Sequence, residues 1–76
     1  MPTVLRKSGF SVRMYFNDHD PPHVHVIHES REARIGLVPV TILSFIGMRR
    51  REASRAKKIV AENRQFLLAK WFELHG

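Results

Sequence analysis

The feature that most constrains the fold of this chain is a change in the spacing of its apolar residues. Up to about residue 37 they alternate with polar residues, as in FSVRMYF at 10–16 and HVHVIH at 23–28. From residue 49 onward they recur every three or four positions. The first spacing is typical of a β-strand with one buried face, and the second of an amphipathic helix. The sequence therefore predicts an α+β fold in which strands precede helices.

The strands are predicted to form a small antiparallel sheet of three or four strands. The candidate strands are 3–7, 10–16, 23–28 and 32–37, and Ser8-Gly9 is typical of a tight turn between the first two. Alternation assigns one apolar face to Phe10, Val12, Met14, Phe16, Val24, Val26, Ile35 and Leu37. Because a short meander needs only tight turns, we expect sequential strands to be neighbours.

Two helices are predicted to cover this apolar face. Pro39 and Gly47 bracket the segment VTILSFI at 40–46, as proline and glycine often bracket a short helix. Arg49 to Leu74 is predicted to form one long helix. Its expected buried stripe is Ala53, Ala56, Val60, Leu67, Trp71 and Leu74, widened by Ile59 and Phe66. The whole chain, residues 1–76, is expected to be a single domain.

Composition narrows the possible functions. The 76 residues include no cysteine, which excludes disulfides and thiolate metal sites. Thirteen Lys and Arg against seven acids give a net charge of +6, which favours nucleic acid or an acidic protein as partner. No segment resembles a signal peptide or a membrane span, so we expect a cytoplasmic protein that does not contact membranes.

Five basic residues are candidates for binding phosphate. Alternation places Arg13 and Arg34 on the sheet face that the helices leave uncovered. Arg50, Lys57 and Arg64 recur at seven-residue intervals along one side of the predicted long helix. These positions suit contacts with a phosphate backbone, and they equally suit an ordinary solvated helix face.

The segment NDHDPPHVHVIHE, residues 17–29, is the candidate catalytic site. His23 and His25 should leave the same face of their strand, with Cα atoms about 6–7 Å apart. Asp18 and His19 lie in the preceding loop, where a carboxylate can orient an imidazole. RNA cleavage through the 2′-hydroxyl needs a base, an acid and a cation for the phosphate. Asp18, His19, His23 and His25 are therefore predicted to be catalytic, beside Arg13 and Arg34.

Two other interpretations of this segment stay open. His23 and His25 could bind a divalent metal, with Asp18, His19 or Asp20 as a third ligand, although acid–base chemistry requires no cofactor. Alternatively, the segment could be a structural loop in which the double proline stiffens a turn. In either case His28 breaks the alternation and should point to the opposite face.

The chain also resembles a known family along its whole length. MPTVLR, NDHDPPHVHV and EARI, with the Gly47-Met48 break and the basic final helix, are similar to bacterial proteins known as domain of unknown function forty-one sixty. The family signature falls on Asp18, His19, Pro21, Pro22, His23 and His25, while Asp20 occupies a variable position. Members of this family resemble toxins of bacterial toxin–antitoxin pairs. The resemblance therefore implies a cognate small antitoxin as partner.

Together these observations give one leading hypothesis and two alternatives. The leading hypothesis is a toxin-like protein that acts on RNA as a ribonuclease through the His/Asp cluster. One alternative is a binding module without catalysis, which holds nucleic acid or a partner protein through the basic helix. The other is a metal-dependent enzyme built on His23 and His25.

Overall fold

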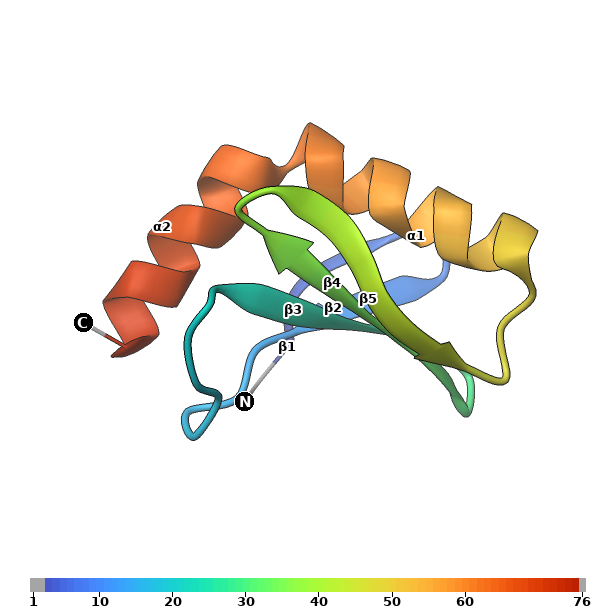
Figure 1. The fold of residues 1–76 in the computed structure, drawn as a ribbon, viewed down its shortest axis with the longest axis horizontal. Helices are drawn as coiled ribbons and strands as arrows, with labels where there is room; N and C mark the ends of the chain where they lie inside the picture. Colours follow the sequence, from blue (N-terminus) through green and yellow to red (C-terminus); the bar gives the residue numbers. More distant parts are fainter. Residues whose placement is uncertain (1–2, 76) are drawn as a thin grey trace.

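Five strands form one antiparallel sheet in which each strand pairs with the next along the chain (Figure 1). They are followed by two helices that lie over the sheet. This computed structural model describes residues 3–75, so residues 1–2 and 76 of the predicted single domain lie outside the described range. The predicted α+β class is confirmed. The elements are β1 (Thr3–Lys7), β2 (Phe10–Arg13), β3 (His23–His28), β4 (Arg31–Leu37), β5 (Val40–Ile46), α1 (Arg50–Glu62) and α2 (Arg64–His75).

Tight turns join the strands that alternation predicted. Ser8 and Gly9 connect β1 to β2 with φ angles of 54° and 83°, the left-handed pair that matches the twist of a two-residue hairpin. Glu29 and Ser30 connect β3 to β4 in the same number of residues. The predicted turn at Ser8-Gly9 is therefore confirmed, and the strands follow one another in the sheet as in a meander.

The segment 40–46 is strand β5 and not the short helix that the sequence predicted. Pro39 lies in the two-residue turn after Leu37, which pairs with Val40 in the β4–β5 hairpin. The segment VTILSFI is rich in β-branched and aromatic residues, which favour a strand over a helix. A short apolar run of this kind fits either structure, and pairing with β4 decides between them. The sheet therefore has five strands and not the three or four that the sequence predicted.

The single long helix predicted from Arg49 to Leu74 is two helices that meet at Asn63. The side-chain amide of Asn63 donates to the Ile59 carbonyl (2.8 Å), so it competes with the backbone for the end of α1. The Asn63 carbonyl then accepts the Leu67 N–H (2.9 Å) and starts α2. Arg64 Nε donates to the Leu37 carbonyl (2.8 Å), which ties this corner to the end of β4.

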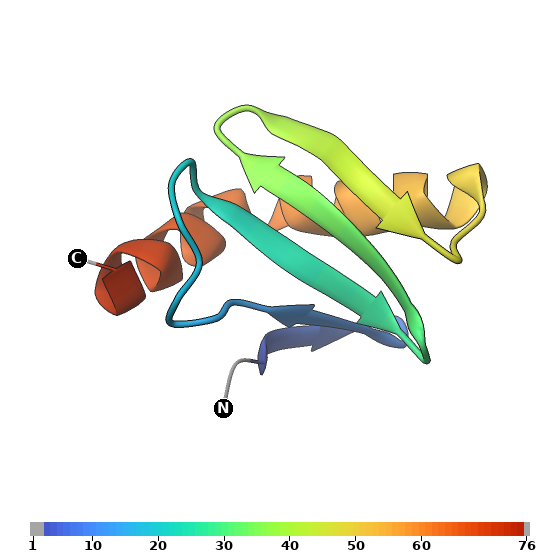
Figure 2. The same cartoon turned by 60° about the horizontal axis from the view of Figure 1, so that its bottom comes forward.

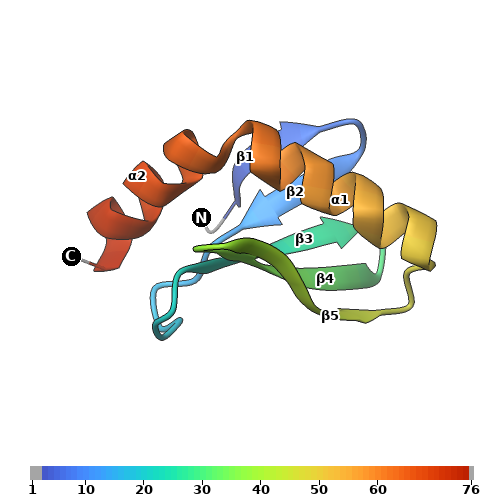
Figure 3. The same ribbon diagram turned by 45° about the horizontal axis from the view of Figure 1, so that its top comes forward.

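The core lies between the sheet and the two helices. Figure 2 shows the sheet face that no helix covers, and Figure 3 shows α1 lying across the other face, with α2 extending beyond the end of the sheet. The buried residues include most of those predicted: Phe10, Val12, Met14, Val24, Val26, Ile35, Leu37, Ala53, Ala56, Ile59, Val60, Leu67 and Trp71. In residues 3–75, no helix has the length and apolar character needed to cross a membrane.

Three residues predicted to be buried are exposed. Phe16 is 80% exposed because β2 ends at Arg13 and the chain leaves the sheet before reaching it. Phe66 and Leu74 are 44% and 36% exposed, because on α2 the buried stripe is only as wide as Leu67 and Trp71. The buried alternation of β2 and the buried stripe of α2 therefore each end before the last residue that the sequence assigned to them.

A charged cluster links the β3–β4 hairpin to α1. The Glu52 carboxylate accepts hydrogen bonds from His28 Nδ1 (2.7 Å) and from Arg31 Nη2 (3.0 Å). His28 thus points to the helix-covered side, as its position in the strand predicted. The hydrogen bonds from Arg31 and then His28 hold the pKa of Glu52 below its ordinary value, against a smaller opposing effect of burial.

Glu52→Gln should therefore destabilise the protein in a pH-dependent way. Because the folded-state pKa is lowered, the carboxylate contributes stability above the ordinary glutamate pKa and loses it as pH falls through the lowered value. Thermal unfolding should show a lower Tm for the variant at neutral pH and a gap that narrows in acid. Glu62→Gln, at an exposed position of the same helix, is the control. A gap of equal size at both pH values would contradict this role.

Candidate functional site

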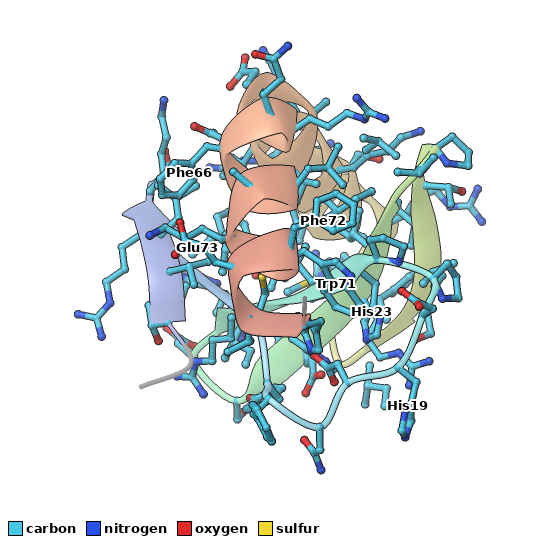
Figure 4. All side chains as sticks on the ribbon, turned by 90° about the vertical axis from the view of Figure 1, so that its left-hand side faces the viewer. His19, His23, Phe66, Trp71, Phe72 and Glu73 are labelled. Atoms are coloured by element: carbon cyan, nitrogen blue, oxygen red, sulfur yellow. The ribbon has the colours of Figure 1, made fainter. Side chains whose placement is uncertain are left out.

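The candidate site begins in the loop between β2 and β3, at the end of the sheet beside α2 (Figure 4). Asp18 closes this loop on itself, since its Oδ2 accepts the Tyr15 N–H (2.9 Å) and its own N–H donates to the Tyr15 carbonyl (3.0 Å). These two bonds leave Asp18 Oδ1 free to face β3. The turn therefore aims one carboxylate oxygen at the histidines of the strand.

His25 lies between two carboxylates on the uncovered face of the sheet. Its Nδ1 is 2.8 Å from Glu32 Oε2 on β4, and its Nε2 is 3.2 Å from Asp18 Oδ1. The Tyr15 ring meets the imidazole edge-on, with ring centroids 4.8 Å apart. Each ring nitrogen of His25 therefore faces one carboxylate oxygen.

His23 is held in a different way. Its Nδ1 is 3.0 Å from the Pro21 carbonyl, which can only accept, so Nδ1 carries the proton. Its Nε2 lies 3.6 Å from Asp18 Oδ1, beyond a good hydrogen bond. Figure 4 shows His23 beside Trp71 of α2, and the two ring centroids are 5.4 Å apart. The rings of His23 and His25 are 5.2 Å apart, which places two imidazoles side by side at one carboxylate.

The site is largely shielded from solvent, and its charges act on Asp18. The side chains of His23, His25 and Asp18 are only 12–14% exposed. Burial alone would raise the pKa of Asp18, but the Tyr15 N–H and the imidazoles of His25 and His23 outweigh it, and the pKa is lowered. Asp18 is therefore a carboxylate over the whole neutral range.

The cluster opens into a shallow cavity of about 330 Å³. Its lining is Asn17, Asp18, His19, Asp20, Pro21, His23, His25, Arg34 and Leu43. Arg34 is exposed and lies opposite His25 in the β3–β4 register. Arg13 lies opposite His25 on the β2 side, and its Nε is buried with no hydrogen-bond partner among the described residues. A cation thus flanks His25 in each neighbouring strand.

The remaining predicted residues are dispersed. His19 lines the cavity but is exposed, and Figure 4 shows it farther out on the loop than His23. Arg50 and Lys57 are exposed on α1, away from the cavity lining. Arg64 is half-buried and its Nε is bonded to Leu37, which gives it a structural role at the start of α2. The structure thus brings together Asp18, His23 and His25.

Sequence reasoning missed three contributors to the site. Glu32 could have been found, because the alternation that buries Ala33 and Ile35 also places Glu32 on the same face as His25. The Pro21 carbonyl and the ring of Trp71 could not, since one is a backbone group and the other lies 48 positions along the chain from His23. Their contacts depend on the path of the loop and on the position of α2.

The family described as Domain of unknown function (DUF4160) matches residues 9–72. The chain belongs to this family. The match covers β2 to β5, α1 and most of α2, so the family includes the whole candidate site and the helix that packs against it. Searches of curated proteins and of solved structures give no significant match.

Asp18→Ala should destabilise the protein by about 1–3 kcal/mol, because it leaves the Tyr15 N–H without its acceptor. Asp18→Asn should lose less, since an amide oxygen can still accept that bond. Asp20→Ala, exposed in the same loop, should change stability by less than about 0.5 kcal/mol. Urea unfolding followed by the fluorescence of Trp71 measures all three, and equal losses for Asp18→Ala and Asp20→Ala would contradict the bracing role.

Proposed function

We propose that this protein is a toxin-like component of a bacterial toxin–antitoxin pair and that it cleaves RNA at the Asp18–His23–His25 cluster. The observation that carries the proposal is the pairing of two differently held imidazoles at one carboxylate, in a cavity flanked by arginine. The toxin–antitoxin context comes from the resemblance. The chemistry comes from the geometry of the site.

The different hydrogen bonds of the two histidines support different roles for them in proton transfer. His25, whose two ring nitrogens face Glu32 and Asp18, is the proposed proton donor. His23 has its proton on Nδ1, directed to the Pro21 carbonyl, so its Nε2 lone pair is the proton acceptor. Asp18 orients both rings. Two imidazoles with ring centroids 5.2 Å apart suit a reaction in which one proton is removed while another is delivered.

RNA is the substrate class that this pair fits. His23 removes the proton of a 2′-hydroxyl, whose oxygen attacks the adjacent phosphorus. His25 protonates the departing 5′-oxygen, which leaves a 2′,3′-cyclic phosphate and a 5′-hydroxyl. Arg34 lies beside the cavity, where its charge stabilises the phosphorane. DNA lacks the attacking hydroxyl and is therefore not cleaved by this route.

A cognate antitoxin and a cytoplasmic location complete the proposal. The net charge of +6 favours an acidic antitoxin, since such a partner neutralises the surface that otherwise attracts RNA. The proposed toxicity requires that the protein and the RNA it cleaves are in the same compartment, the cytoplasm. Co-purification of the neighbouring gene product from a native extract tests the pairing directly.

A second candidate function is RNA binding without cleavage, through α1. Its exposed surface carries Arg50, Arg51, Arg55, Lys57 and Lys58, near Arg49 at the helix start. Such a basic face holds a phosphate backbone through charge alone. The arginines around Glu52 line a hollow of about 620 Å³, so the basic surface is concave there.

Incubating the purified protein with single-stranded RNA, in the presence of a chelator, should yield 2′,3′-cyclic phosphate ends. His25→Ala and His23→Ala should each lower the cleavage rate by about 10²–10⁴-fold, the usual effect of removing a general acid or base. DNA of the same sequence is the substrate control. Lys7→Ala, at an exposed position of β1 outside both the cavity lining and the basic face of α1, is the protein control for folding and charge.

Binding of RNA without any cleavage would support the α1 module and remove the ribonuclease. Induction in bacteria tests the toxin separately: expression of the wild-type protein should arrest growth, and His25→Ala should not. A harmless wild-type protein, expressed without its partner, would contradict the toxin assignment whatever the chain does to RNA in vitro.

A further inference from the structure

His23 and His25 both direct their Nε2 atom toward Asp18 Oδ1. His25 Nδ1 bonds to Glu32 and His23 Nδ1 bonds to the Pro21 carbonyl, so each ring is fixed through its Nδ1. Both Nε2 atoms consequently face Asp18 Oδ1, at 3.2 Å and 3.6 Å. An imidazole nitrogen without a proton repels a carboxylate oxygen. A positive charge at this point, a proton or a metal ion, removes that repulsion and is attracted by all three atoms.

The separations of these three atoms fit a metal ion. Bonds of 2.0–2.2 Å from a tetrahedral zinc to nitrogen and oxygen require neighbouring ligand atoms to be about 3.3–3.5 Å apart. The two Nε2–Oδ1 distances lie close to that range, and ligand atoms of all three residues are within 4.8 Å of one another.

We propose that Asp18 Oδ1, His23 Nε2 and His25 Nε2 bind one divalent transition-metal ion, with the fourth position open to the cavity. Two imidazoles and one carboxylate suit Zn²⁺ or Co²⁺ and disfavour Mg²⁺ and Ca²⁺, which prefer oxygen ligands throughout. Three protein ligands and one open position describe a site that can also hold water or an anion. Arg34 lines the same cavity, and its positive charge favours an anion over water at the open position.

The surroundings of the three ligands hold them in place before a metal arrives. Glu32 and the Pro21 carbonyl accept the protons on the two Nδ1 atoms, and the Tyr15 N–H holds the other oxygen of Asp18. Histidine ligands of metal sites almost always donate their second N–H to a carboxylate or a carbonyl, which fixes the tautomer that leaves Nε2 free. The same two partner types occur here, one on each ring.

The metal site rests on this geometry, and its effect on RNA cleavage rests on the proposed function. A metal ion bound to both Nε2 atoms would occupy the lone pair of His23, the proposed base. It would also take the place of the proton on Nε2 of His25, the proposed acid. Metal binding and acid–base cleavage therefore exclude one another at this cluster. Zn²⁺ acts as an inhibitor, and the chelator in the cleavage experiment keeps the protein active.

Titration of the metal-free protein with Co²⁺ tests the site without RNA. The expected result is one ion per chain, with the visible absorption of a four- or five-coordinate ion that Zn²⁺ displaces. Asp18→Asn and His25→Ala should abolish this absorption. Glu32→Gln should weaken binding by about 10–100-fold, as loss of a ligand's hydrogen-bond partner does.

His19→Ala is the matched control, because this exposed histidine comes from the same loop and lies outside the proposed ligand set. It should bind Co²⁺ as the wild-type protein does. Absence of the absorption in the wild-type protein would overturn the proposal. Loss of the absorption in His19→Ala would also overturn it, and so would its persistence in His25→Ala. Near-UV circular dichroism of Trp71 confirms that each variant is folded, and Asp18→Asn keeps the shape of the loop.

The two proposals fail separately. Co²⁺ binding in a protein that never cleaves RNA would preserve the metal site and remove the ribonuclease. Cleavage in a protein that binds no Co²⁺ would do the reverse. Acceleration of cleavage by Zn²⁺ would overturn the mutual exclusion and would make the metal part of the catalytic site.

Discussion

The structure depends on the burial of one face of the sheet and not the other. Within β3, Val24 and Val26 enter the core between the sheet and the helices, so His23 and His25 must leave on the opposite face. A slip of one residue in the register would bury the histidines and expose the valines. The apolar core of this small domain therefore also determines where its polar site lies.

The second determinant is the loop that carries Asp18. A single carboxylate binds the Tyr15 N–H with one oxygen and faces two imidazoles with the other. Its lowered pKa shows that these contacts outweigh the cost of partial burial. The negative charge is kept at neutral pH, so the cluster attracts a proton or a metal ion. Both the proposed acid–base chemistry and the proposed metal site follow from this one interaction.

The last helix connects the core to the site. Trp71 is buried, and its ring packs against both His23 and His75. The ring nitrogens of His75 lie 3.1 Å from the carbonyls of Trp71 and Tyr15, which attaches the end of α2 to the base of the Asp18 loop. The bend at Asn63 allows α2 to reach past the end of the sheet, as Figure 1 shows. A straight helix would continue in the direction of α1.

Local patterns in the sequence determined β1 to β4, the turn at Ser8-Gly9, most of the core, and the shared face of His23 and His25, because alternation alone assigns a side chain to a face. Asp18 lies outside the strands, and its hydrogen bonds with Tyr15 aim it at the histidines. Tertiary structure decided the rest. Pairing with β4 made 40–46 a strand, and a side-chain hydrogen bond from Asn63 divided the long helix. The contacts of Glu32, Pro21 and Trp71 with the histidines join separate elements, and no spacing within one segment encodes such distances.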